Sequence, residues 1–217
     1  MWRNYWKISW QSLRKKPFYT FINLVGLAIG MAISLLILLY LEKEFSYDTQ
    51  WKKPIYRLAI QYKNDKEVKR MAVAEPHIAL TLPLAFKQIT HLTRVLPTEG
   101  SILGYQQQNT YYNDVFFADS LFFDVFSHKV LKGSIEGVFR NAETKDIVLT
   151  EDLAEEIFGL ENPIGKKLEV RTTNAFSYDG SYVVRAVIAK TEQTHFPFKA
   201  LISWDYEDKF VEVSWAY

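Results

Sequence analysis

The pattern of charged and uncharged positions divides the chain into three parts. No charged residue occurs from Pro17 to Leu41, a run of 25 positions. As a helix this run measures about 37 Å at roughly 1.5 Å per residue, and the hydrocarbon core of a bilayer is about 30 Å thick. The run therefore predicts a transmembrane helix over 17–41, between a short N-terminal segment (1–16) and a long C-terminal region (42–217).

Two other interpretations compete with a retained membrane anchor. A buried helix of a soluble protein seldom exceeds about 20 residues without a charge. A cleaved signal peptide has an apolar stretch of about 7–15 residues followed by a small-x-small site. Here the apolar run is longer, and Glu42, Lys43 and Glu44 follow it. The length and the flanking residues both favour a retained anchor.

Residues 2–14 have the spacing of an amphipathic helix ahead of the anchor. Ile8 and Lys16 do not fit this pattern. We expect the helix to lie on the inner leaflet, with aromatic residues toward lipid and basic residues toward headgroups. Contact with a cytoplasmic partner is an alternative that the residues leave open. At 100° per residue, the two faces are Trp2, Tyr5, Trp6, Ser9, Trp10 and Leu13 against Arg3, Lys7, Gln11 and Arg14.

Small and polar residues interrupt the apolar run. Gly26 and Gly30 form a small-xxx-small pair, which lets another helix approach closely. Asn23 and Ser34 are uncharged polar residues inside the span, and both favour a helix partner over lipid. We therefore expect helix packing at these four residues.

The outer region mixes strand and helix patterns. Thr150 is expected to cap the helix 151–158 with Glu151 and Asp152 in its first turn, and Gly159 is expected to end it. Because strands and helices do not alternate strictly, the pattern predicts an α+β fold. The expected strands are 55–62, 92–96, one or two in 105–118, 147–149, 166–171, 182–189 and 199–203, and the other expected helices are 76–89, with Pro83 in its first turns, and 121–126, capped by Asp119 or Ser120.

Charge adds a direction to the membrane segment. The chain has 26 basic and 25 acidic residues, but residues 1–16 hold five basic residues and no acid. The other 21 basic residues face all 25 acidic ones, a net charge of −4. Basic flanks stay in the cytoplasm, so we expect the N-terminus inside and residues 42–217 outside the cytoplasmic membrane.

Composition excludes several classes of protein. The absence of cysteine excludes a disulfide scaffold, a Cys-ligated zinc site and a thiol nucleophile. Balanced charge argues against a nucleic-acid binder. The four histidines (77, 91, 128 and 195) lack metal-ligand spacing, and no G-x-S-x-G motif occurs. We expect no catalytic residue, metal or cofactor.

One stretch partly imitates a phosphate-binding loop. Between Gly159 and Gly165 lie five residues where the P-loop has four, and Lys167 replaces the Ser or Thr that would hold Mg²⁺. The stretch also follows a predicted helix and precedes a strand, which is the reverse of the P-loop order. A helix C-cap followed by a turn is the better interpretation.

Four segments in order resemble one family. Residues 18–30 look like the first membrane helix of MacB/FtsX-like ABC transporter permeases, with the "fiNi-GLaiG" entry of Bacteroidetes-type members. Asp119–Phe126 resembles their "D-x-x-F-F-D-V-F" segment. Residues 147–166 resemble "ivlTe-lA-k-FG-xx-NPiGk", and 194–203 resemble "sHf-fd-l-S". One departure is Val184–Val187, where the glycine of the family's "V-x-G-V" strand is absent.

The resemblance implies a function. Such permeases dimerise and pair with a cytoplasmic ABC ATPase, and the first membrane helix transmits motion to a periplasmic domain that acts on a substrate or periplasmic partner. That domain combines a porter-like mixed subdomain with a β-rich insertion, which we place at about 100–185. Three further membrane helices follow in the family, so residues 42–217 are expected to be a C-terminally incomplete periplasmic core domain.

Two other function classes remain open. A single-span sensor or binding module shares the topology, but sixteen inner residues are too few for a cytoplasmic output domain. A membrane-anchored enzyme is disfavoured because the chain lacks the motifs described above.

Overall fold

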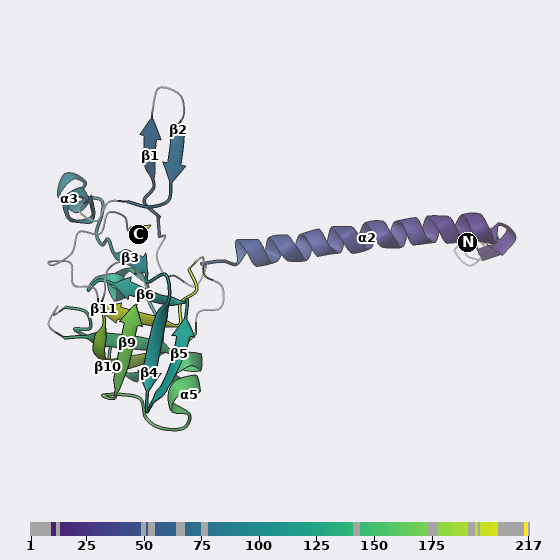
Figure 1. The fold of residues 1–217 in the computed structure, drawn as a ribbon. Helices are drawn as coiled ribbons and strands as arrows, with labels where there is room; N and C mark the ends of the chain where they lie inside the picture. The colour runs from purple at the N-terminus through teal and green to yellow at the C-terminus, as the bar shows by residue number, and fades with distance from the viewer. Residues whose placement is uncertain are drawn as a thin grey trace. The chain divides into compact units, whose positions relative to one another are not determined.

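The computed structural model describes residues 10–11, 14–48, 51, 55–63, 68–74, 78–140, 144–172, 178–190, 194, 196–203 and 215–216. The chain forms two compact units, Met1–Thr49 and Gln50–Tyr217. Figure 1 shows a long helix in the first unit and a β-rich domain in the second.

The first unit contains helix α2, Pro17–Phe45. Pro17 occupies the first turn, where its missing N–H costs no hydrogen bond. Its apolar side chains are exposed within the unit, and the helix is long and apolar enough to cross a membrane. It continues four residues past the predicted span, because Glu42, Lys43 and Glu44 are good helix formers. The backbone N–H of Ser46 donates to Glu42 and closes the last turn.

The second unit contains short helices and many strands. The helices are α3 (Ile78–Ala85), α4 (Phe122–Val125) and α5 (Glu151–Phe158). The strands are β1 (Ile60–Lys63), β2 (Val68–Met71), β3 (Arg94–Pro97), β4 (Ser101–Tyr105), β5 (Gln108–Tyr112), β6 (Val115–Ala118), β7 (Val130–Gly133), β8 (Asp146–Thr150), β9 (Lys167–Thr172), β10 (Gly180–Ile188), β11 (Ala200–Ser203) and β12 (Trp215–Ala216).

Ten of the strands form one mixed sheet (Figure 1). Their order is β12-β3-β6-β11-β8-β10-β9-β4-β5, and β7 also pairs with β10. The pairs β8–β10 and β6–β11 are parallel, and the other pairs are antiparallel. The central strands β6, β8 and β11 are buried along their whole length, which explains their continuous apolar sequences.

A bend in the chain connects β3 and β6, near one end of this strand order, with β4 and β5 at the other end. β3 pairs with β6 and β4 pairs with β5, so the short links between β3 and β4 and between β5 and β6 bend one two-stranded ribbon. At the bend, the Thr98 hydroxyl donates to the Val115 carbonyl at 2.9 Å, and Ser101 donates to Thr98. Gly100 has φ +114°, and a Cβ there would lie 2.1 Å from the Tyr111 hydroxyl oxygen. The sheet therefore curls back toward itself at a position that requires glycine.

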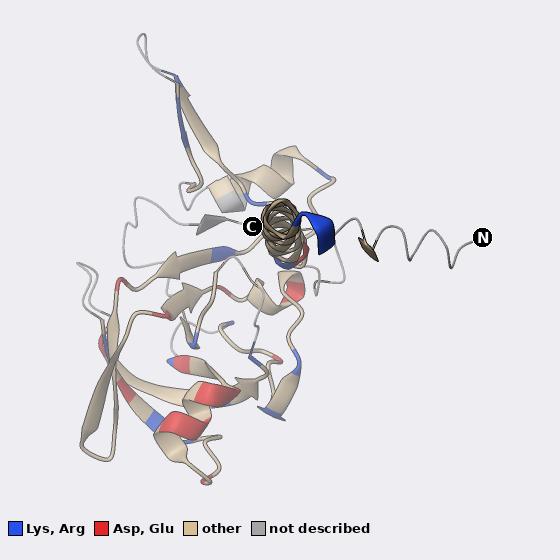
Figure 2. Ribbon diagram, turned by 90° about the vertical axis from the view of Figure 1, so that its right-hand side faces the viewer, with Lys and Arg blue, Asp and Glu red and all other residues tan. Residues whose placement is uncertain are grey.

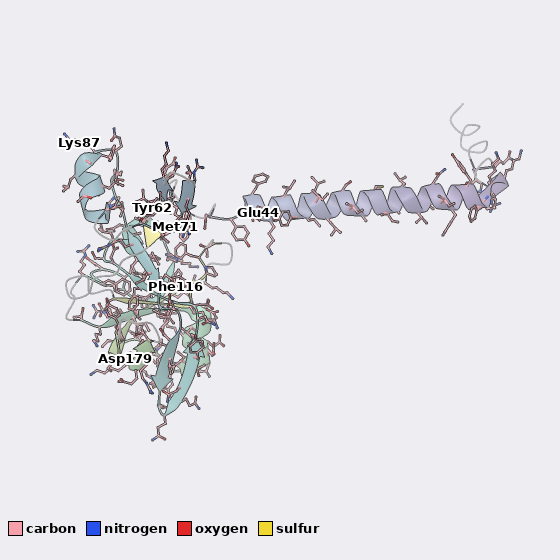
Figure 3. All side chains as sticks on the ribbon, turned by 45° about the horizontal axis from the view of Figure 1, so that its top comes forward. Glu44, Tyr62, Met71, Lys87, Phe116 and Asp179 are labelled. Atoms are coloured by element: carbon pink, nitrogen blue, oxygen red, sulfur yellow. The ribbon has the colours of Figure 1, made fainter. Side chains whose placement is uncertain are left out.

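The curled sheet separates two hydrophobic cores. Successive residues of β8 alternate, with Ile147 and Leu149 in one core and Val148 in the other. Helix α5 contributes Leu153 to the first core, and α4 contributes Phe122 to the second. A third, smaller core under the β1–β2 hairpin and α3 contains Ala74, Leu92, Leu58, Ile60, Leu82 and Ile89. Figure 3 shows Tyr62 and Met71 on this hairpin.

The structure corrects several sequence predictions. The strand predicted from Ile55 begins only at Ile60, and β2, β4, β7 and β12 were not predicted. Pro83 is the sixth of eight residues in α3, not part of its first turns. The position of the β-rich insertion at about 100–185 stays a prediction, and strands on both sides of this range, β3 and β11, belong to the same sheet. The predicted helix 151–158 is confirmed, and Gly159 follows it with φ +58°.

Candidate functional site

The four residues expected to pack against another helix lie on one side of α2. Spacings of three, four and four place Asn23, Gly26, Gly30 and Ser34 within an arc of about 80° at 100° per residue. A Cβ added at either glycine would meet no atom within 4 Å among the described residues. This stripe is therefore a shallow, open groove along the helix within its own unit.

Ser34 uses its hydroxyl hydrogen inside the helix. Its Oγ donates to the Gly30 carbonyl at 2.9 Å. Because this donor is satisfied locally, Ser34 has less need of a partner helix than the sequence suggested. The side chain still offers an acceptor, and together with Asn23 it keeps the stripe polar.

The predicted inner-leaflet helix lies mostly outside the described residues. Trp2, Arg3, Trp6 and Lys7 belong to that part, whereas Trp10 and Arg14 are described. The Arg14 guanidinium lies over the Trp10 ring, 5.6 Å from its centroid. The sequence assigns Trp10 to the aromatic face and Arg14 to the basic face, and at a spacing of four these faces adjoin. The contact is compatible with both assignments, which stay predictions.

Asp119, the first residue of the "D-x-x-F-F-D-V-F" segment, joins two parts of the sheet domain. Its Oδ1 accepts hydrogen bonds from the Thr93 hydroxyl at 2.6 Å and the Leu121 backbone N–H at 3.2 Å. Its Oδ2 accepts from the backbone N–H and the Nε of Arg94, both at 3.1 Å. Asp119 and Arg94 are both buried. The predicted cap at Asp119 or Ser120 is wrong, because α4 begins after Leu121 and has no side-chain cap hydrogen bond. Asp119 instead forms an ion pair with Arg94 that ties the start of α4 to β3.

The aromatic residues of the same segment build the second core. Phe122 and Phe126 are fully buried, and their ring centroids lie 5.0 Å apart. Phe196, from the "sHf" segment, packs edge-on against Phe126 at 4.9 Å. Two of the motifs that carry the family resemblance therefore meet in one core.

His128 lies inside this aromatic cluster. Its ring stacks on Phe122 at 5.7 Å and contacts Trp51 and Phe198, while Nδ1 lies 3.0 Å from the Phe126 carbonyl oxygen. Burial lowers the pKa of His128 to about 4, against a weaker opposing effect of the Phe126 carbonyl. The histidine is therefore a neutral part of the core at pH 7.

This environment predicts acid sensitivity of the outer domain. The unfolded state takes up a proton near pH 6.5 and the folded state only near pH 4, so stability is complete above 6.5 and falls as pH drops toward 4. Between pH 7.5 and 5 we expect a loss of about 2 kcal/mol through His128. Urea unfolding of the full chain at both pH values, followed by tryptophan fluorescence, measures the loss. His128→Phe should remove most of it, and an unchanged pH dependence would contradict this role.

Thr150 and Lys166 define the ends of the α5 motif. Thr150 occupies the N-cap position of α5, as predicted, but its hydroxyl donates to the Lys199 carbonyl at 3.0 Å and makes no cap hydrogen bond. The Lys166 ammonium pairs with Glu161 and donates to the Tyr105 hydroxyl at 3.0 Å. The pKa of Glu161 is lowered, mainly by its hydrogen bond from Lys166.

Lys166 also lies 5.4 Å from the ring centroids of Tyr105 and Phe158. The Lys166 ammonium therefore links the turn after α5 to β4, and its contacts are with Glu161 and aromatic rings, which does not favour a phosphate-binding role. We expect the purified chain to turn over no ATP. We also expect Lys166→Met to lower the melting temperature slightly and to leave the absence of ATP turnover unchanged. ATP turnover that is lost in Lys166→Met would contradict this assignment.

The described residues show no metal-binding cluster and no catalytic arrangement. Among the described residues, no group of three or more His, Cys, Asp or Glu could hold a metal ion. A surface hollow of about 370 Å³ lies between α4 and the segment after β7, lined in part by Phe123, Asp124, Glu136 and Arg140. Its lining has both charge signs and shows no arrangement of nucleophile and base.

The comparison with known families decides the class of protein. Residues 20–215 match the MacB-like periplasmic core domain family. The chain belongs to the MacB-like periplasmic core domain family. The resemblance predicted from the sequence is thereby confirmed, together with an α+β extracytoplasmic domain that carries one N-terminal candidate transmembrane helix. The family forms part of ABC-transporter-type permeases.

Solved structures show the same fold at low identity. A domain of a proposed permease protein from Porphyromonas gingivalis has a TM-score of 0.53 and 14% identity, over 68% of this chain and 69% of that chain. The extracellular domain of the noncanonic ABC-type transporter YknZ from Gram-positive bacteria has a TM-score of 0.51 and 12% identity, over 74% and 82%.

A third structure is more distant. The periplasmic region of MacB from Actinobacillus actinomycetemcomitans gives a TM-score of 0.46 at 17% identity, over 65% of this chain and 63% of that chain. No curated protein matches the sequence.

Sequence reasoning missed the residues that complete these contacts. Thr93 and Arg94 lie some 25 positions before Asp119, and Tyr105 lies 61 positions before Lys166. The one available signal was a base within an otherwise apolar strand, at Arg94, which a buried carboxylate must accompany.

Proposed function

We propose that the chain is the N-terminal part of a permease subunit of an ABC transporter. In this role α2 transmits motion from a cytoplasmic ATPase to the outer domain, which acts on a substrate or periplasmic partner during export. ATP hydrolysis belongs to the separate ATPase subunit. Two copies of the permease form the transporter, and residues beyond 217 supply further membrane helices.

The observation that carries this proposal is the continuity of α2. The helix runs without a break through Phe45 and measures about 44 Å at 1.5 Å per residue, longer than the hydrocarbon core. A continuous helix is stiff along its axis, so a displacement at one end reaches the other. Only five residues separate its end from Trp51, which packs against Phe126 in the second core of the outer domain.

The proposed orientation places the N-terminus in the cytoplasm. The five basic residues before the helix and the three acidic residues among 42–48 support this direction. The segment 1–16 then lies at the inner leaflet, where Trp2, Trp6 and Trp10 contact lipid and Arg3, Lys7 and Arg14 contact headgroups. A reporter enzyme that is active only outside the cytoplasm, fused after Tyr62, should be active. Activity of only a cytoplasmic reporter at that site would exclude this topology.

Partnership with an ATPase tests the function directly. The permease, expressed from its whole gene with the neighbouring ABC ATPase gene, should co-purify with the ATPase and change its turnover of ATP. Sequence beyond codon 217 should encode three more hydrophobic spans. A gene that lacks further spans and an ATPase that does not bind would together contradict the proposal.

A further inference from the structure

Strand β5 is the outer strand at one end of the ten-stranded sheet. It pairs with β4, and no described strand pairs with its other edge (Figure 1). The register joins Tyr105 with Gln108 across a two-residue turn, so the backbone groups of Gln108, Thr110 and Tyr112 point to β4. The N–H and C=O groups of Asn109 and Tyr111 consequently point away from the sheet.

This edge lacks the features that normally prevent pairing. Native edge strands carry lysine, proline or inward-pointing charges, which block the approach of another strand. Residues 100–113 contain no charged residue and no proline. Four of the five residues of β5 are exposed. The edge is therefore open to a further strand.

We propose that β5 pairs antiparallel with β5 of a second copy of the chain, centred on Thr110. In this register Thr110 lies opposite Thr110 of the second copy, and Asn109 lies opposite Tyr111. Asn109 and Tyr111 of each copy exchange backbone hydrogen bonds, which gives four in all. The symmetric pair closes on itself, so the assembly ends at two copies.

The neutral composition of β5 favours a second copy as the occupant, whereas charge disfavours contact between copies elsewhere on the domain. Residues 94–217 hold 12 basic and 19 acidic residues, a net charge of −7, so two copies repel each other elsewhere on this domain. Four of these acidic residues, Glu151, Asp152, Glu155 and Glu156, lie on α5 (Figure 2). By contrast, β5 and its turn read Gln-Gln-Gln-Asn-Thr-Tyr-Tyr from residue 106, a neutral composition that favours pairing between identical strands.

Edge pairing of this size depends on the membrane anchor. Two five-residue strands bury far less than the roughly 1,200–2,000 Å² of a stable interface. Anchoring both copies in one transporter raises their effective concentration to the millimolar range, where a weak contact forms. The inference thus rests on the dimer of the proposed function and specifies which part of the outer domain it joins.

Residues 1–217 contain no cysteine, which suits a crosslinking test. Thr110→Cys is introduced into the full-length permease, in which any cysteine beyond residue 217 is replaced by serine. The protein is expressed in membranes with two different affinity tags and oxidised. Opposed residues of a non-hydrogen-bonded pair have Cα atoms about 4.5 Å apart, within the range of a disulfide. We expect disulfide-linked dimers at a yield at least about fivefold above that of Leu160→Cys, a fully exposed control for random collision.

A proline variant shows whether strand pairing causes the crosslink. Asn109→Pro removes an N–H that points away from β4, so the β4–β5 hairpin keeps its own hydrogen bonds. In the Thr110→Cys background it should lower the crosslink at least about fivefold, whereas Asn109→Ala should not.

Tag co-purification separates the two hypotheses. If the two tagged copies co-purify but Thr110→Cys crosslinks no better than Leu160→Cys, the β5 pairing is wrong, whereas the dimer of the proposed function is supported. If they do not co-purify, the dimer of the proposed function is wrong, and the pairing with it. A Thr110→Cys crosslink to a different protein in place of the second copy also overturns the pairing.

Discussion

Asp119→Ala is expected to lower the free energy of unfolding of the outer domain by about 3–5 kcal/mol, because it leaves the buried Arg94 cation without its carboxylate. It also removes the acceptor of the Thr93 hydroxyl and of two backbone N–H groups. For a domain of this size the melting temperature should fall by roughly 10 °C. Thermal unfolding of the full chain in detergent, followed by near-UV circular dichroism, measures the change.

Asp124 provides the matched control, since it lies on the same helix α4 and is exposed. Asp124→Asn should change stability by less than about 0.5 kcal/mol. Replacing Asp119 and Arg94 together with apolar residues should recover part of the loss, because no buried charge is then left alone. Equal effects of Asp119→Ala and Asp124→Asn would show that the buried pair is unimportant.

Gly30→Leu is expected to impair the complete permease about tenfold in ATPase-coupled function, a loss that corresponds to 1–2 kcal/mol of helix packing in a membrane. A leucine at this position fills the groove between Gly26 and Ser34 and pushes a neighbouring helix away. Insertion should be unaffected, because hydrophobicity rises. ATPase-driven export in cells, at equal membrane levels of the permease, measures the effect.

Two further variants test whether the glycine face is the cause. Gly26→Leu should act like Gly30→Leu, since both lie in the same stripe. Ala32→Leu adds a comparable side chain about 160° away from Gly30 at 100° per residue and should have little effect. The volume-conserving Leu35→Ile should also do little. Normal function of both glycine variants would mean that this face of α2 meets lipid.

The elements that were predicted well depend on interactions close in sequence. Helix α5 has acidic residues in its first turn and Gly159 just beyond its end, and these signals act within a few positions. The elements that were predicted poorly depend on distant partners. Pro83 lies in the second half of α3, where packing of Leu82 against the third core places the helix.

The candidate contacts divide in the same way. The stripe on α2 follows from spacing alone, because a helix repeats every 3.6 residues. The contacts of Asp119 and Lys166 do not, since their partners lie far away along the chain and meet them only when the sheet curls. Thr150 takes the N-cap position that its sequence position predicted, but its hydroxyl donates to the Lys199 carbonyl and not to α5.

The sequence by itself determined the membrane helix and the class of the outer domain. A run of uncharged residues that is long enough to cross a bilayer partitions into the membrane. Alternating or continuous apolar residues favour strands. Both signals lie within a short stretch of sequence and do not depend on distant partners. Only the tertiary structure decided that Asp119 pairs with Arg94, that His128 is neutral among aromatic rings and that β5 has a partner on only one edge among the described strands. These features depend on strand order, which is set by the summed packing of two cores across one curled sheet and by no single local signal.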